Sequence, residues 1–301
     1  MRKMSTTITT HYTQSNILNK IKSGLNTLGK NQPTIHDLAP VDEFHVGGLP
    51  ATKSLLNHLN IASNDRILDI GCGIGGAARF MVHTHQCKVT GIDLTPEYIE
   101  VGNALNAMCN ISTKEIQLQI GSGTDLKSCL GENGNQFDKA IMLHVGMNIE
   151  NKAKLFEEIA LQLRPGGLLG IYDIVRLGTN QHEDLDYPVP WASQHSMDYT
   201  VSDIEYREAA KAAGLNIIGE YNCYNKAIEF ANKMQKAKAK EKAKAEANGD
   251  LRSINDAPPL SLGILMGDNF PIKMGNIIGN IRKERITPYE FIFQKVDNSK
   301  M

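Results

Sequence analysis

Apolar and polar positions alternate with two different periods along the middle of the chain. Short apolar runs of strand length are separated by segments in which apolar residues recur every three or four positions. The runs predict strands near 66–70, 88–92, 116–120, 137–143, 168–174 and 215–221. The longer segments predict helices near 75–84, 96–109, 151–163 and 202–213. This alternation is typical of an α/β fold, a doubly wound, mostly parallel sheet with helices on both faces.

The flanking regions add helices to this unit. Residues 1–15 are polar and predict a flexible tail, and apolar positions between Ile17 and Leu28 lie on one helical face, within an N-terminal helical addition at 16–60. A final strand is expected within 289–297, so the central domain comprises 61–221 plus 289–297. The intervening residues 222–288 predict a helical cap, an insertion before the last strand.

The first part of this insertion has a biased composition. Residues 232–248 are almost entirely Ala, Lys and Glu, which favours an exposed helix. A nucleic-acid contact is the weaker interpretation, because no aromatic residues interleave with the lysines.

Charge and cysteine content exclude several classes of protein. The formal net charge is −1, so no basic field attracts nucleic acid. No apolar run approaches the ~18 residues that cross a bilayer, so we expect no stable membrane insertion. The 5 cysteines form no CxxC pair, which favours reduced thiols, a cytoplasmic location and no metal site.

A glycine-rich turn carries the strongest functional signal. The first predicted strand runs directly into Gly71, Cys72, Gly73 and Gly75, where glycines let the backbone turn sharply into a helix. Asp93 ends the second predicted strand and can accept hydrogen bonds from a ribose diol. Together these residues predict a nucleoside-binding site at the edge of the sheet.

The identity of the bound nucleoside can be narrowed further. The glycine spacing also matches a dinucleotide fingerprint, so an NAD-dependent oxidoreductase is one alternative. Asp69 argues against it, because a carboxylate there repels a pyrophosphate and attracts a cationic amino-acid group. The polar stretch 121–125 follows the third predicted strand, where it could address an adenine edge.

These segments have a family resemblance. Residues 67–80, 90–95, 121–126, 137–148 and 163–174 resemble the successive motifs of S-adenosylmethionine-dependent methyltransferases of the Rossmann-like class. The resemblance implies a seven-stranded sheet whose last strand lies antiparallel between the fifth and sixth. It also implies a set of cofactor contacts, namely Asp69, Gly71, Cys72, Gly73, Gly75, Asp93, Leu94, Gly123, Thr124, Asp125 and His144.

The resemblance assigns these contacts to parts of the cofactor. Asp69 and the glycines hold the methionine moiety, and Asp93 binds the ribose. Leu94, Thr124 and Asp125 lie beside the adenine, and His144 faces the reactive centre.

Three further segments are similar to a narrower group. Residues 42–48, 142–148 and 187–192 resemble the sarcosine/dimethylglycine N-methyltransferases and, more distantly, the phosphoethanolamine, tocopherol and ubiquinone-pathway enzymes. In such enzymes the first segment covers the cofactor, and the segment after the fifth strand lines the acceptor pocket.

Five residues are candidates for catalysis. His144, His45 and His195 are possible proton acceptors, because histidine titrates near neutral pH. Each has a plainer interpretation, as a backbone contact for the first two and as an exposed loop residue for His195. Trp191 can hold a cation on its ring or simply pack the cap on the sheet. Asp173 can pair with an ammonium group or cap the following segment.

The sequence therefore predicts an enzyme that transfers a methyl group from S-adenosylmethionine to a small molecule. The acceptor atom predicted is an amine nitrogen, as in sarcosine or dimethylglycine. The alternatives are O- or C-methylation of a quinone-like, polyketide or lipid-linked acceptor, and a non-catalytic cofactor-binding module.

Overall fold

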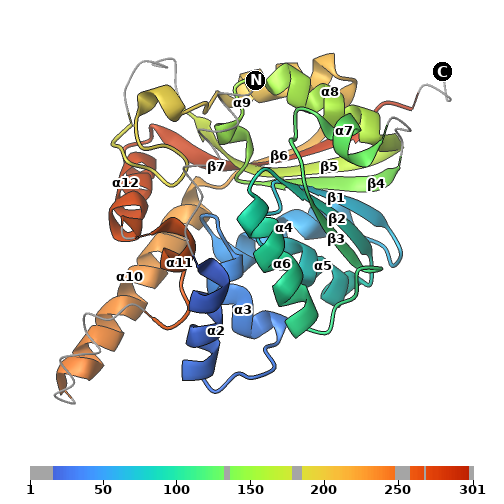
Figure 1. Ribbon diagram of the computed structural model, residues 1–301. Coiled ribbons are helices and arrows are strands. Elements are labelled where there is room, and N and C mark those ends of the chain that lie inside the picture. The colour runs from blue at the N-terminus through green and yellow to red at the C-terminus, as the bar shows by residue number, and fades with distance from the viewer. Residues whose placement is uncertain (1–15, 132–135, 178–184, 248–257, 268, 298–301) are drawn as a thin grey trace.

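A seven-stranded sheet forms the centre of the computed structural model, which describes residues 16–131, 136–177, 185–247, 258–267 and 269–297 (Figure 1). The strand order is β3-β2-β1-β4-β5-β7-β6. The strands are β1 Arg66–Ile70, β2 Lys88–Asp93, β3 Ile116–Ile120, β4 Phe137–Leu143, β5 Leu163–Arg176, β6 Leu215–Asn222 and β7 Ile286–Lys295. The first five strands pair in parallel, and β7 lies antiparallel between β5 and β6.

The chain reverses its direction of winding at β1. After β1 it adds β2 and β3 on one side, and it then returns to place β4 and β5 on the other. Ligands of open α/β sheets bind at such a switch point, outside the carboxyl ends of the strands. The carboxyl ends of β1 and β4 therefore mark where a site is expected.

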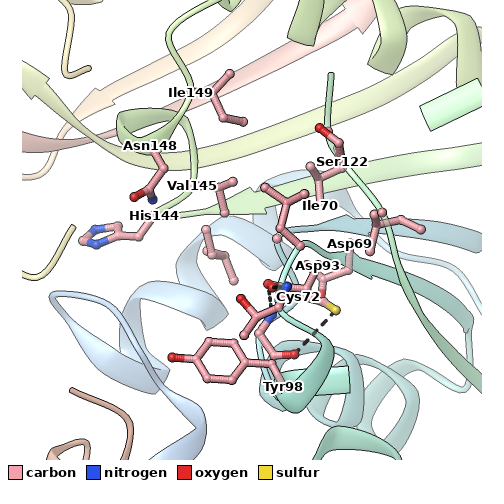
Figure 2. Close-up of a pocket in the computed structure, with 18 of the residues that line it drawn as sticks. Asp69, Ile70, Cys72, Asp93, Tyr98, Ser122, His144, Val145, Asn148 and Ile149 are labelled. Carbon is pink, nitrogen blue, oxygen red and sulfur yellow. Dashed lines mark hydrogen bonds between the residues drawn. The ribbon is translucent and has the colours of Figure 1, made fainter. Parts of the chain in front are cut away.

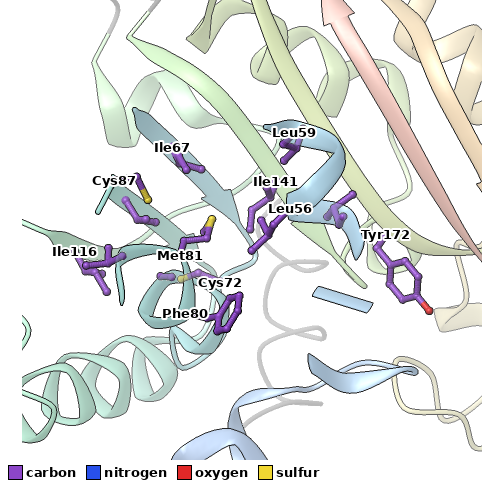
Figure 3. Packing of buried hydrophobic residues seen from close by; sticks show 14 of the residues in the cluster. Leu56, Leu59, Ile67, Cys72, Phe80, Met81, Cys87, Ile116, Ile141 and Tyr172 are labelled. Carbon is purple, nitrogen blue, oxygen red and sulfur yellow. The ribbon is translucent and has the colours of Figure 1, made fainter. Parts of the chain in front are cut away.

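Helices cover both faces of the sheet. One face packs against α4 Gly48–Leu59, α5 Gly76–His85 and α6 Pro96–Met108, through a core that includes Leu56, Met81 and Ile141 (Figure 3). The other face packs against α7 Leu126–Leu130, α8 Lys152–Gln162 and α9 Asp203–Ala212. Sandwiching the sheet in this way explains why its strands read as nearly continuous apolar runs.

The N-terminal addition forms an outer layer. Helix α2 Ile17–Thr27 packs on α6, and α3 Ile35–Asp42 packs on α5. Helix α3 was not predicted, although its start is encoded by a capping box in which Thr34 and Asp37 accept each other's backbone N–H. Its end brings Asp42 against Gly76, at the start of α5.

The insertion before β7 is helical. It contains α10 Tyr224–Ala247, α11 Gly263–Met266 and α12 Phe270–Arg282, and the far end of α10 projects from the body (Figure 1). Helix α10 begins eight residues before the predicted exposed helix, because Ala227 is buried against Ile277 and Ile286. In the described part of the chain, no helix is long and apolar enough to span a membrane.

The predicted fold class is confirmed, including the antiparallel last strand. Each predicted strand is found, although β5 begins at Leu163 rather than near residue 168 and β7 begins at Ile286. The predicted tail 1–15 lies outside the described residues, and the domain boundaries remain a prediction.

Candidate active site

A cavity of about 630 Å³ opens at the switch point of the sheet. Its walls come from the carboxyl ends of the first four strands and from the segment that follows α3 (Figure 2). Ten of the predicted cofactor contacts line it, namely Asp69, Gly71, Cys72, Gly73, Asp93, Leu94, Gly123, Thr124, Asp125 and His144. Gly75 does not line the cavity, since it lies at the start of α5 beside Leu118 and Arg79.

The glycine-rich turn has a backbone that requires glycine. Gly71 and Gly73 have φ of +69° and +54°, in the left-handed region. A Cβ on Gly71 would lie 2.3 Å from Cγ2 of Val145, whereas a Cβ on Gly73 would meet nothing within 4 Å. The turn therefore packs against the loop after β4 at Gly71 and leaves open space over Gly73.

One buried and one partly buried carboxylate flank this turn. Asp69 is 2% exposed, and its Oδ2 has no hydrogen-bond partner. Burial, together with the nearby charge of Asp93, raises the pKa of Asp69 to about 7. Asp93 accepts the backbone N–H groups of Gly73 at 2.9 Å and Thr95 at 2.8 Å, yet burial still raises its pKa.

This pair fits the predicted cofactor. A buried carboxylate with an unpaired oxygen is costly until a cation or donor reaches it. S-adenosylmethionine has an amino group that would suit Asp69 and ribose hydroxyls that would suit Asp93. The open space over Gly73 allows its close approach to the backbone.

Two histidines at another part of the cavity wall cluster with a buried tyrosine. His144 lies stacked on Tyr172 with ring centroids 5.4 Å apart, and His45 contacts both rings edge-on at 5.8 and 5.9 Å. The backbone N–H of His144 donates to the carbonyl of Tyr172, and Nε2 of His144 is buried without a partner. Burial lowers the pKa of His144 far below its usual value and that of His45 to about 4, so both rings are neutral at neutral pH.

The contacts that Thr52 and Gly48 make with Nε2 of His45 determine the tautomer of this ring. Thr52 donates its hydroxyl proton to Glu43 at 2.7 Å, so its oxygen is an acceptor for Nε2 of His45 at 3.1 Å. The carbonyl of Gly48, which can only accept, lies 3.2 Å from the same nitrogen. Nε2 therefore carries the proton, and Nδ1 keeps the basic lone pair.

A buried ion pair holds the end of α3, at Asp42, against the start of α5. Arg79 is fully buried, donates from Nε and Nη2 to the two oxygens of Asp42, and donates from Nη1 to Asn106 at 2.9 Å. Burial raises the pKa of Asp42 to about 6 even with this guanidinium beside it. A Cβ on Gly76 would lie 2.5 Å from the Cβ of Asp42, which shows how closely the end of α3 packs against the start of α5.

Three predicted catalytic residues do not line this cavity. Trp191 is 1% exposed, packs with Val189 and Ile277, and donates its indole N–H to Asp198 at 2.9 Å. This placement corrects its predicted cation-binding role and matches packing of the cap. His195 lies in an exposed short helix, His195–Met197, away from the cavity lining.

Asp173 is also corrected, because its carboxylate is completely buried within the protein. It accepts the backbone N–H of Gly146 and the hydroxyl of Tyr206, and burial raises its pKa to about 6. Asp173 therefore acts on the loop that follows His144 rather than on a ligand.

Sequence reasoning missed Tyr172, Thr52 and the role of Glu43. Tyr172 precedes Asp173 near the carboxyl end of a predicted strand. Ligands bind at this end of the strands, so its position could have marked Tyr172 as a residue near the site. Thr52 gives no such signal, because only folding of α4 against the segment 42–48 brings it to His45.

Comparisons with known proteins identify the domain that contains most of the cavity lining. Residues 67–167 match the family model described as a methyltransferase domain. The chain is 29% identical over 151 residues to erythromycin 3''-O-methyltransferase of Saccharopolyspora erythraea, an alignment that covers 48% of this chain and 47% of that protein. The chain spans about half the length, or less, of the curated relatives it matches.

Solved structures share the fold. A Galdieria sulphuraria protein described as a sarcosine dimethylglycine methyltransferase superposes with a TM-score of 0.61 at 18% identity, covering 93% of this chain and 99% of that one. Phosphoethanolamine N-methyltransferase 2 of Haemonchus contortus, with phosphomonomethylethanolamine and S-adenosylhomocysteine, gives 0.62 at 20% identity, covering 91% and 61%. The predicted resemblance to methyltransferases is confirmed for residues 67–167, which match a methyltransferase domain, and the solved structures show that the chain shares their fold.

Proposed function

We propose that this chain transfers a methyl group from S-adenosylmethionine to the amine nitrogen of a small molecule. The observation that carries the proposal is the unpartnered Oδ2 of Asp69, buried at the glycine-rich turn beside Asp93. When bound, S-adenosylmethionine supplies a methyl group already activated by the positive charge on sulfur. Asp69 would hold its amino group, and Asp93 would accept its ribose hydroxyls.

The protein's remaining task is to position the acceptor and to remove a proton. Alignment in a site that excludes water can supply ~7–11 kcal/mol of rate acceleration. A protonated amine must lose a proton before its nitrogen lone pair can form the new N–C bond. That proton leaves to water, and His45 and His144, which line the cavity as neutral imidazoles, can orient the neutral amine that remains.

Calorimetry with S-adenosylhomocysteine tests the cofactor assignment directly. We expect binding at sub-millimolar concentration, and Asp93→Ala should weaken it about ten- to hundredfold, the cost of hydrogen bonds to a charged group. Asp203→Ala is the matched control, since that carboxylate lies outside the cavity and pairs with Arg207 at 2.7 Å. Absence of binding in the unmodified protein would refute the proposal.

O- or C-methylation of an apolar acceptor is a second candidate. Phe44, Leu143 and Leu265 also line the cavity, and they could contact a phenol or a lipid-linked molecule. A panel of amines and phenols with labelled donor separates the two reactions. Transfer to phenols alone would favour this second candidate.

A further inference from the structure

The cavity has an excess of carboxylates. Six acidic residues line it, namely Asp42, Glu43, Asp69, Asp93, Asp125 and Glu150. Among the described lining residues Lys154 is the one lysine or arginine, and its Nζ lies 2.8 Å from Glu158. The positive charge of Lys154 is therefore already shared with a carboxylate outside the cavity.

Part of this negative charge is compensated and part is not. Arg79 neutralises Asp42, and the amino group of the proposed cofactor would face Asp69. Glu43 is different, because its hydrogen-bond partner is the hydroxyl of Thr52 and its histidine neighbour is neutral. Burial raises the pKa of Glu43, outweighing the Thr52 hydrogen bond and the charge of Lys53.

Glu43 lies at the histidine end of the cavity. Its Oε2 is 3.5 Å from Nε2 of His45, whose ring centroid is 5.8 Å from that of His144. His144 also lines this end of the cavity, and its Nε2 is buried in the protein without a partner.

We infer that the methyl acceptor is an amine that carries no carboxylate or phosphate group, selected by Glu43 at the histidine end of the cavity. This inference rests on the proposed function. An amine reacts through its neutral form, so an amino acid or a phosphorylated amine would react as an anion. Two like charges ~6 Å apart at an effective dielectric constant of ~20 repel enough to weaken binding about tenfold to hundredfold.

Matched ligand pairs test the inference. The pairs are sarcosinamide with sarcosine, ethanolamine with phosphoethanolamine, and benzylamine with 4-carboxybenzylamine, each titrated into protein saturated with S-adenosylhomocysteine. We expect the member without the anionic group to bind at least about tenfold more tightly. The rate of methyl transfer from a labelled donor should favour the same member of each pair.

Variants separate charge from shape. Glu43→Gln should reduce the preference to about threefold or less, Glu43→Asp should retain most of it, and Glu208→Gln on the exposed surface of α9 should leave it unchanged. If S-adenosylhomocysteine itself fails to bind, the proposed function fails. If it binds but the anionic members bind equally well or better, only the present inference is overturned. If it binds but no amine binds at millimolar concentration, both the present inference and the amine acceptor of the proposed function are overturned.

Discussion

The carboxylate of Asp173 accepts a hydrogen bond from the backbone N–H of Gly146 at 2.6 Å, across the carboxyl ends of β5 and β4. The same oxygen, Oδ2, accepts the hydroxyl proton of Tyr206 at 2.7 Å. This buried contact holds the loop that begins at His144. The position of His144 in the cavity wall therefore depends on Tyr206, which packs on the sheet face covered by α8 and α9.

Removing one donor from this contact should loosen the loop. We expect Tyr206→Phe to lower the free energy of unfolding by about 1–3 kcal/mol, because a buried charged acceptor loses a partner. Urea denaturation measures this loss. Tyr221→Phe, on a side chain that is 41% exposed, should change stability by less than about 0.5 kcal/mol. Equal losses in the two variants would contradict the role of the Asp173 contact.

Gly73 and Gly29 form a matched pair for testing the glycine-rich turn. Both have positive φ, +54° and +69°, and a Cβ on either would meet nothing within 4 Å. Alanine at either position should cost about 1–2 kcal/mol of stability from backbone strain. Only Gly73 lines the cavity, so Gly73→Ala should also weaken S-adenosylhomocysteine binding by about tenfold or more. Equal affinity in the two variants would remove the turn from the cofactor site.

Cofactor affinity should depend on pH through Asp69. Its pKa is raised to about 7 in the free protein, and the ionised form is the one that attracts the cofactor's amino group. Affinity for S-adenosylhomocysteine should therefore rise with pH, by up to about tenfold per unit below pH 7, and level off above it. Calorimetry across this range should show a flatter, weaker profile for Asp69→Asn. An unchanged slope in that variant would show that another group titrates.

The Arg79–Asp42 pair should contribute far more than an exposed pair. Arg79→Met leaves Asp42 buried and unpaired, which should cost about 3–5 kcal/mol. The double variant Arg79→Met with Asp42→Asn should recover much of that stability. As a control, Arg207→Met removes a partly exposed pair with Asp203 and should cost about 1 kcal/mol or less. Thermal and urea unfolding measure all three, and similar costs for Arg79 and Arg207 would contradict this difference.

Thr52 should act on turnover through His45. Thr52→Val preserves shape but removes one of the two acceptors of the Nε2 proton, so we expect kcat to fall about tenfold while KM for S-adenosylmethionine stays within about twofold. Thr52→Ser restores the hydroxyl and should recover most of kcat. An unaltered kcat in Thr52→Val would show that the contact between Thr52 and His45 is unimportant for turnover.

The sheet and the cavity at its edge are determined locally, and this is why the sequence predicted them. Each strand of β1 to β4 is a short apolar run, and the cavity-lining residues Gly71, Asp93 and His144 lie at or next to a strand end. Parallel strands bring such residues to one edge of a sheet, so position along the chain was sufficient.

The partners of the other polar and aromatic side chains were decided by packing between segments that are distant in the sequence. Trp191 and Asp173 have side chains suited to ligands, but the fold buries both against protein partners. Glu43 and Thr52 become neighbours of His45 only because α4 folds back beneath the segment that precedes it. Hydrophobic periodicity records which residues are buried, whereas the partner of each buried polar group depends on tertiary contacts that no local pattern encodes.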